Sequence, residues 1–170
     1  MEHNITERQE IEDIQQRIVA SVERSKGELG LIELAHNADT SFLRVLAIQR
    51  IKAREALSYL GTSPFDERVR KAAVERIDDQ PVLCQVVLHD LHWEVRLAAL
   101  ERVTAAAVVE KVATSDRSRL VRYAAVGRVD DPGVLTRIAV GDAAAEVSEH
   151  AQRRLAMLRT SPVARVVLRD

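Results

Sequence analysis

The amino-acid sequence predicts an all-α fold, in which short pairs of helices stack into an α-solenoid, and two observations support this fold class. A nine-residue stretch recurs along the chain, and each copy begins 26 residues after the previous one. Within each copy the apolar residues recur every three or four positions, which is the spacing of an amphipathic helix and not the alternation of a strand. The copies are LRVLAIQRI at 43–51, VRKAAVERI at 69–77, VRLAALERV at 95–103, VRYAAVGRV at 121–129 and VSEHAQRRL at 147–155. A unit this short cannot bury its apolar stripe alone, so we expect about six two-helix units to stack on one another.

The first predicted element is an amphipathic helix over residues 6–25. Its apolar residues are Ile11, Ile14, Ile18 and Val22, and Glu, Gln and Arg lie between them. The end of this helix keeps the register of the later copies, so we interpret it as a degenerate second helix that caps the stack. A terminal cap of a solenoid requires a polar outer face, and we expect the outer face of this helix to be polar.

Each following unit is predicted to contain a first helix, a turn and a second helix that carries the nine-residue stretch. Gly and Pro mark the turns, as in GTSP at 61–64 and DDPG at 130–133. The predicted first helices cover 31–36, 54–60, 82–89, 107–114 and 134–140, and the second helices cover 42–52, 67–77, 94–103, 119–129 and 146–158. We predict one domain over 1–170, with a cap at 1–25, repeats at 26–158 and a tail or truncated repeat at 159–170.

On a helical wheel the nine-residue stretch divides into a packed side and an outward side. An alanine recurs on the packed side and lets neighbouring helices approach closely: Ala47, Ala73, Ala99, Ala125 and Ala151. In stacked helix pairs the second helices line the concave surface, so their outward residues are the candidate surface for a protein or peptide partner. We call six of these residues the second-helix row: Lys71, Glu75, Leu97, Glu101, Tyr123 and Glu149. The sequence leaves open the alternative that they are ordinary scattered surface residues.

Arginine is the most regular residue in the chain. One ladder has 26-residue spacing and consists of Arg24, Arg50, Arg76, Arg102, Arg128 and Arg154, and a second consists of Arg44, Arg70, Arg96 and Arg122. Aspartates also hold one register, just before the second helices: Asp90, Asp116 and Asp142. The arginines either line a basic groove for phosphate or an acidic peptide, or pair with aspartates and turn carbonyls of adjacent units. Because the first ladder includes the degenerate end units, we predict the structural role.

Charge and hydropathy argue against several classes of partner. The formal net charge is −1 at pH 7, so no bulk field would attract nucleic acid or an anionic membrane. No apolar run reaches the roughly 18 residues of a membrane helix, and the first residues lack a hydrophobic signal region. We therefore expect a cytoplasmic protein. The apolar tail at 163–168 would leave a solenoid end unprotected, which makes it a candidate for self-association.

No catalytic, cofactor-binding or metal-binding set is predicted. Cys84 is the only cysteine, which excludes a disulfide within the chain, and its apolar neighbours indicate a buried, inert thiol. His89 and His92 lie beside Trp93, but metal ligation needs further ligands converging in space. We interpret the two histidines as solvated turn residues. The chain is therefore predicted to be a binding protein and not an enzyme, with no cofactor.

With the unit defined, the chain resembles the HEAT-like repeat proteins, especially the short bacterial form related to the bilin-lyase repeat. The resemblance rests on the pattern D-x4-VR-x-AA-x-ER-[IV], read at 90–103 and at 116–129, where Gly127 departs from Glu. It covers residues 31–158 and implies a right-handed α-α superhelix. Members of this family perform scaffolding, lyase chaperoning, DNA-lesion excision and metal-dependent hydroxylation on one fold.

We predict a non-catalytic module that binds a protein or peptide, and the resemblance leaves two alternatives. The first is nucleic-acid binding of the DNA-lesion glycosylase type, in which Arg70, Arg96 and Arg122 would face an open groove. The second is lyase or chaperone activity on a tetrapyrrole, which would need a pocket near the histidine pair and the tryptophan described above.

Overall fold

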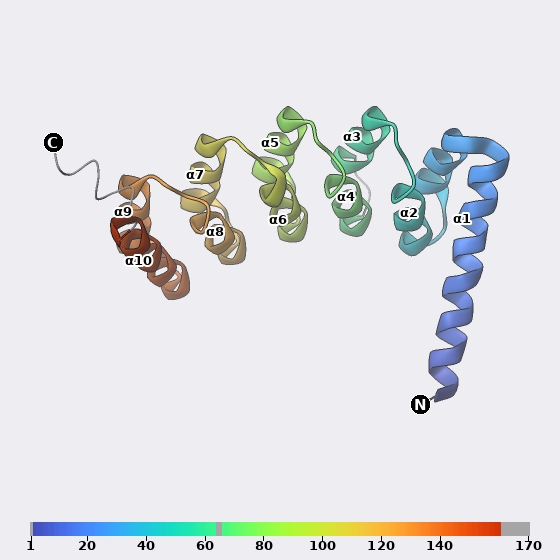
Figure 1. Ribbon diagram of the computed structural model, residues 1–170, viewed down its shortest axis with the longest axis horizontal. Helices are drawn as coiled ribbons and strands as arrows, with labels where there is room; N and C mark the ends of the chain where they lie inside the picture. The colour runs from blue at the N-terminus through green and yellow to red at the C-terminus, as the bar shows by residue number, and fades with distance from the viewer. Residues whose placement is uncertain (1, 64–65, 161–170) are drawn as a thin grey trace. The chain divides into compact units, whose positions relative to one another are not determined.

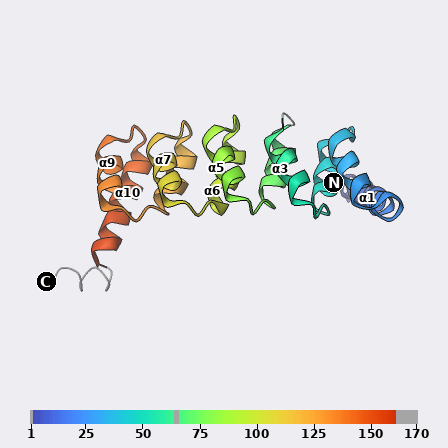
Figure 2. The same ribbon diagram turned by 90° about the horizontal axis from the view of Figure 1, so that it is seen from above.

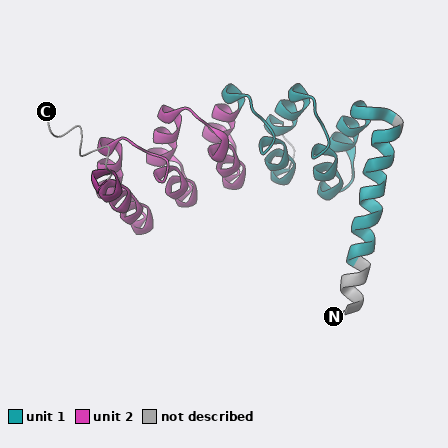
Figure 3. Ribbon diagram, viewed as in Figure 1, with its two compact units in different colours: residues 1–82 teal, residues 83–170 magenta. Residues whose placement is uncertain are grey.

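The computed structural model describes the backbone of residues 2–63 and 66–160, and the side chains of these residues except 2–7 and 25. Every regular element in this part of the chain is a helix, which confirms the predicted all-α class. The chain divides into two compact units, residues 1–82 (unit 1) and residues 83–170 (unit 2) (Figure 3). The predicted tail at 159–170 lies outside the described residues beyond Thr160.

Unit 1 is built from a long helix and three short ones. These helices are α1 (Glu2–Asn37), α2 (Ser41–Ile48), α3 (Arg54–Thr62) and α4 (Glu67–Val74) (Figure 1). Helix α2 packs against both α1 and α4, and α3 packs against α4. The cores of these contacts are aliphatic, and Ile48, Leu60 and Val74 are completely buried.

Unit 2 contains a further series of helices. They are α5 (Gln80–His89), which begins in unit 1, α6 (Trp93–Arg102), α7 (Ala106–Ser115), α8 (Arg119–Val126), α9 (Pro132–Gly141) and α10 (Ala145–Thr160). Helix α8 packs against α6, α7 and α10, and α9 packs against α7 and α10. The close pairing of α9 with α10 is visible in Figures 1 and 2.

The recurring alanines lie where the wheel placed them. Each of the alanines at positions 47, 73, 99, 125 and 151 has a relative accessibility of 0%. A small methyl group lets neighbouring helices approach closely, and overpacking a filled core of this kind forces strained rotamers. The packed side of the nine-residue stretch is therefore confirmed as core.

Capping residues explain where several helices begin. The Asp66 carboxylate accepts a hydrogen bond from the Val69 amide at 3.0 Å at the start of α4. The Asp131 carboxylate accepts from the amide of Val134 at 3.0 Å, with Pro132 in the first turn of α9. Each cap satisfies amide groups that have no partner within the helix.

The ends of the second helices differ from the prediction. Helices α2, α4 and α8 end at Ile48, Val74 and Val126, about one turn before the predicted ends. In these three copies the last residues of the nine-residue stretch form a tighter turn, in which the amide of Arg128, for example, donates to the carbonyl of Ala125 at 2.9 Å. This turn leaves carbonyl groups at the helix end for other donors.

Helix α1 joins two predicted helices into one element with a kink. Gly27 has φ 62° and ψ −148°, a backbone conformation that L residues with a side chain rarely adopt. Gly30, by contrast, lies within the helix and is buried. The glycine at position 27 is therefore the one that turns the chain from the predicted cap into the first predicted repeat.

The expectation that the predicted cap has a polar outer face is wrong. Ile11 is 56% exposed, Ile14 52% and Ile18 40%, whereas Val19 is completely buried. Helix α1 contacts the rest of unit 1 through the side that carries Val19, so its isoleucine stripe lies away from the core. No helix within the described residues is both long enough and apolar enough to cross a membrane.

Candidate functional site

The most deeply buried charged group in the described structure is the guanidinium of Arg96 on α6. Its side chain is 2% exposed, and it forms a bidentate pair with Asp116, with Nε to Oδ2 and Nη2 to Oδ1 both at 2.8 Å. The remaining nitrogen, Nη1, donates to the carbonyl oxygens of Asp90 at 3.0 Å and Leu91 at 3.2 Å. This arrangement matches the planar fork of arginine to a carboxylate and satisfies its donors inside the protein.

The same arrangement recurs one helix pair further along unit 2. Arg122 on α8 pairs with Asp142, with Nε to Oδ2 at 2.7 Å and Nη2 to Oδ1 at 2.8 Å. Its Nη1 donates to the carbonyl of Asp116 at 2.8 Å. Asp116 thus accepts from Arg96 through its carboxylate and from Arg122 through its backbone, and it links consecutive second helices of unit 2.

Each of these aspartates also shapes its own turn. The carboxylate of Asp116 accepts from the Ser118 amide at 2.7 Å, and that of Asp142 accepts from the Ala144 amide at 2.8 Å. The hydrogen bond from Arg122 lowers the pKa of the Asp142 carboxyl below its usual value, although partial burial opposes this shift. The pKa of Arg122 is raised by the same hydrogen bond. Both groups are therefore held in their charged forms.

This shift predicts an acid-sensitive contribution to stability. Because the pKa of Asp142 is lower in the folded chain, the ionised pair stabilises the fold above the ordinary pKa of 3.8, and its contribution is lost as the pH falls through the folded pKa. We expect the thermal midpoint of the wild type to fall more steeply below about pH 5 than that of Asp142→Asn. Circular dichroism melting curves at stepped pH would measure the difference. Equal slopes for both proteins would contradict the assignment.

The other arginine ladder binds backbone carbonyls at helix ends. Arg76 donates to the carbonyl of Ile48, and Arg128 donates to the carbonyls of Leu100 and Val103. Arg154 donates to the carbonyl of Val129 at 3.3 Å and to the carboxylate of Asp130 at 2.7 Å. The carbonyls left open at the end of a helix favour a cationic donor. The remaining three members differ: Arg50 contacts Gln16 and Glu23 on α1, and Arg24 donates to the carbonyl of Ala20 on its own helix. Arg102, at the end of α6, is half-buried and has interactions of its own.

These contacts bear on the nucleic-acid alternative. It required Arg70, Arg96 and Arg122 to face an open groove, and for Arg96 and Arg122 this expectation is wrong. Arg96 is buried, and the side chain of Arg122 is 15% exposed in its pair with Asp142. Arg70 is half-buried and has interactions of its own. No observation among the described residues therefore favours a phosphate-binding groove along this arginine ladder.

The second-helix row is distributed over both units, and each part is described by itself. In unit 1, Lys71 and Glu75 lie on α4 and at its end, with Nζ and Oε1 3.7 Å apart. In unit 2, Leu97 is half-buried on α6, and Glu101, Tyr123 and Glu149 are exposed on α6, α8 and α10. Since α8 packs against both α6 and α10, the unit 2 residues of the row lie on three neighbouring helices.

Within the second-helix row, Tyr123 makes defined contacts with a residue outside the row, His150. Its ring lies 4.2 Å from the ring of His150 on α10, centroid to centroid, with 30° between the planes. His150 Nδ1 lies 3.1 Å from the carbonyl oxygen of Tyr123. A carbonyl oxygen can only accept, so Nδ1 carries a proton, and in the neutral ring Nε2 is left as an acceptor.

Gly127 leaves space beside this imidazole. A Cβ atom at Gly127 would lie 3.5 Å from Cε1 and 3.9 Å from Nε2 of His150. Other copies of the nine-residue stretch carry a larger residue at the corresponding position, for example Glu101. A longer side chain would extend over the ring, so the glycine keeps the edge of His150 with Nε2 uncovered by α8.

The sequence identified Tyr123 as a candidate but missed His150. The signal was present in the repeat: where His150 stands, the three preceding copies have Ala72, Ala98 and Ala124. A bulky polar side chain at a small-residue position is the departure that marks the site. Its contact with Tyr123 depends on how α10 packs on α8, which the repeat pattern alone does not specify.

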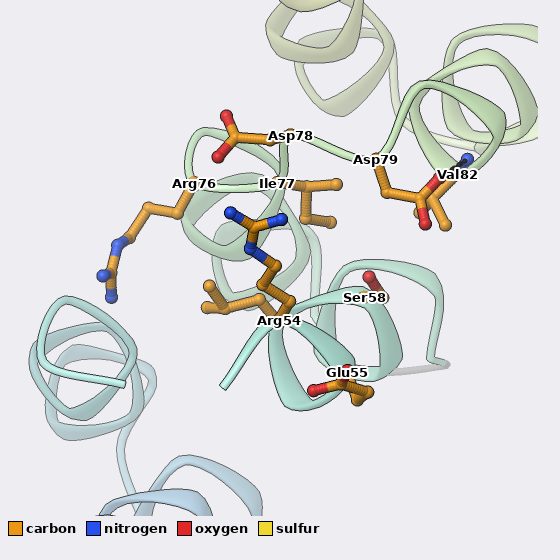
Figure 4. A pocket seen from close by; sticks show the side chains of 9 residues that line it. Arg54, Glu55, Ser58, Arg76, Ile77, Asp78, Asp79 and Val82 are labelled. Atoms are coloured by element: carbon orange, nitrogen blue, oxygen red, sulfur yellow. Dashed lines mark hydrogen bonds between the residues drawn. The ribbon is translucent and has the colours of Figure 1, made fainter. Parts of the chain in front are cut away.

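The pocket drawn in Figure 4 lies elsewhere, in unit 1, and has a volume of about 490 Å³. Leu57 and Ile77 contribute apolar walls, and Arg54 extends its guanidinium toward the chain that follows α4. Arg76 turns away from the pocket toward the end of α2, where it binds the carbonyl of Ile48. The pocket therefore contains both charge signs but no residue of the second-helix row.

The residues considered for metal or tetrapyrrole chemistry are spread over a helix end and a turn. His89 ends α5 and is exposed, and His92 precedes α6, where its ring stacks on Trp93 at a centroid distance of 6.3 Å. Among the described residues, no group of three His, Cys, Asp or Glu side chains is placed to hold a metal ion. Cys84 is half-buried, so the prediction of a buried thiol is only partly right. The tetrapyrrole alternative stays a prediction.

Comparison with known proteins adds no relative to this description. No protein-family model, no curated protein and no solved structure matches the chain.

Proposed function

We propose that the chain is a right-handed α-solenoid of HEAT-like repeats and that it serves as a non-catalytic interaction module for a protein or peptide. The solenoid is supported by the helix starts: α2, α4, α6, α8 and α10 begin at Ser41, Glu67, Trp93, Arg119 and Ala145, at the spacing of the sequence motif. Buried alanines at one motif position in every copy support it as well. The second helices would line its concave side and carry the binding surface.

The binding function is supported by one observation on the second helices of unit 2: their repeated polar residues are bound inside the protein, and their variable residues lie at the surface. The repeated polar groups, such as Arg96 and Arg122, are bound inside the protein by Asp116 and Asp142. The variable residues on the same helices remain at the surface, and Tyr123 is 39% exposed. Side chains that differ between copies and reach solvent are the ones available for specific recognition.

The chemistry of this surface favours a partner segment that contains a basic side chain. Glu101 is exposed and has no ion-pair partner among the described residues, and the Tyr123 ring offers a face for a cation. His150 adds an acceptor at Nε2 in its neutral form. A lysine or arginine of the partner can stack on the aromatic face. An acidic segment would be repelled by Glu101.

The test compares two tyrosine variants. Affinity purification from native cells, followed by titration of the identified partner, should give a dissociation constant about tenfold weaker for Tyr123→Ala, because exposed aromatic anchors contribute strongly to interfaces. Tyr59→Ala is the matched control. Tyr59 is also exposed, at 55%, and its ring stacks with that of His36 at a centroid distance of 6.3 Å, but it lies on α3, which is the first helix of its repeat and not a second helix. Glu101→Lys should weaken binding as well.

Circular dichroism should show the same helix content for all three variants, since the substituted side chains are exposed. Equal affinities for wild type and Tyr123→Ala, or an equal loss in Tyr59→Ala, would overturn the proposed surface.

A further inference from the structure

The long helix α1 presents an apolar stripe that nothing in the described part of unit 1 covers. Ile11, Ile14 and Ile18 are 56%, 52% and 40% exposed, and they are separated by three and four residues, so they share one side of the helix. The first part of α1 extends away from the other helices of unit 1 (Figure 1). Contiguous exposed apolar surface of this kind marks an interaction site.

Unit 1 holds α1 by a different side. Val19 is completely buried, Gln16 accepts a hydrogen bond from Arg50 at 3.2 Å, and Glu23 lies 3.8 Å from the same arginine. Successive residues are about 100° apart around a helix, so Val19 points roughly a quarter-turn away from Ile18. A second helix can therefore approach the stripe without displacing the contacts with unit 1.

One edge of the stripe carries two side chains of opposite charge. Glu10 and Arg17 are both exposed, and neither has an ion pair or hydrogen bond among the described residues. They are seven residues apart, which is about two helical turns, so both lie on the same edge. In an antiparallel pair of α1 helices, this edge of one chain faces the same edge of the second chain. The two edges run in opposite directions.

We propose that α1 forms an antiparallel homodimer with α1 of a second copy of this chain. A two-fold axis near Ile14 places Glu10 opposite Arg17 of the second copy, and Arg17 opposite Glu10 of the second copy. Ile11 then lies beside Ile18 of the second copy, and the two Ile14 side chains meet near the axis. Such an interface is self-complementary, as a two-fold contact must be.

Charge favours a second copy of this chain in the antiparallel orientation over a parallel pair and over a membrane surface. A parallel pair would place Glu10 near Gln15 of the second copy and Arg17 near Val22, with no ion pair. A membrane surface would favour a polar face rich in lysine and arginine. Here Glu12 and Asp13 lie on the polar side instead.

Sedimentation of the full chain over a wide concentration range tests the proposal. We expect the wild type to shift from monomer to dimer as concentration rises, and Ile14→Lys to remain monomeric with unchanged helix content. Met157→Lys, at a 62% exposed methionine on α10, is the matched control and should dimerise like the wild type. A monomeric wild type, or a dimer that persists in Ile14→Lys, would overturn the proposal.

A charge exchange tests the antiparallel register. Glu10→Arg carries two positive charges on the edge and Arg17→Glu two negative charges, so each variant alone should dimerise about tenfold more weakly. An equal mixture should recover dimers close to the wild-type affinity, because both cross-pairs are then opposite in charge. A mixture no tighter than the separate variants would overturn the antiparallel arrangement.

Discussion

Asp116→Ala is expected to lower the free energy of unfolding of unit 2 by about 3–5 kcal/mol. The substitution leaves the Arg96 guanidinium charged and without a counter-ion at a site where the two side chains are only 2% and 5% exposed. It also removes the acceptor for the Ser118 amide at the start of α8. Urea unfolding followed by circular dichroism would measure the change.

Two comparisons separate the buried pair from ordinary surface charge. Glu146→Ala breaks the pair with Arg119, whose side chains are 49% and 66% exposed, and should cost less than about 1 kcal/mol. Adding Arg96→Met to Asp116→Ala should recover much of the loss, because the penalty comes from the uncompensated charge. Equal losses for Asp116→Ala and Glu146→Ala would contradict this account.

Leu100→Ala is expected to lower the free energy of unfolding by about 2–5 kcal/mol. Leu100 lies on α6 and is 1% exposed, so the substitution removes buried methyl groups and leaves a cavity that the close-packed helices cannot fill. Its backbone carbonyl, which accepts from Arg128, is retained. The measured loss therefore reports side-chain packing and not the arginine contact. Urea unfolding would measure it.

Leu120→Ala is the matched control for this prediction. Leu120 lies on the neighbouring helix α8 and is 50% exposed, so its replacement should change stability by no more than about 0.5 kcal/mol. A loss at Leu120 comparable to the loss at Leu100 would show that the assignment of core and surface on these helices is wrong.

The proposed binding surface and the proposed dimer use different parts of the chain. The first depends on Tyr123 and its neighbours in unit 2, and the second on the stripe of α1 in unit 1. Ile14→Lys should therefore leave the intrinsic affinity for the partner unchanged, and Tyr123→Ala should leave dimerisation unchanged. A dimer would present two copies of the surface, which raises the apparent affinity for a partner with two binding segments.

The helices themselves were predictable because their signals are local. Apolar spacing indicated each of the short helices, and the predicted first helix at 107–114, for example, lies within α7. Capping residues such as Asp66 and Asp131 act within a few residues of where they stand. The close approach at Ala99 and Ala125 was predictable for the same reason, since a recurring small residue on the apolar side is a local pattern.

The candidate site was predictable only in part. Tyr123 was found because it differs from the other copies on the outward side of the helix. His150 was missed, although it replaces an alanine of the earlier copies, because its effect appears only when α10 packs on α8. For the arginines the sequence favoured the structural role over a basic groove, but it did not identify the acceptor that each side chain binds.

By itself, the sequence determined that the chain is helical, where its helices lie and which side of each second helix is packed, because periodicity expresses the geometry of single helices. The tertiary structure decided which acceptor each arginine binds: Arg96 pairs with a carboxylate 20 residues away, and Arg76 with a carbonyl 28 residues before it. It also decided that the stripe at Ile14 is exposed, although the same spacing predicts a packed face. Burial and pairing depend on which surfaces meet, and that is a property of helices packed together.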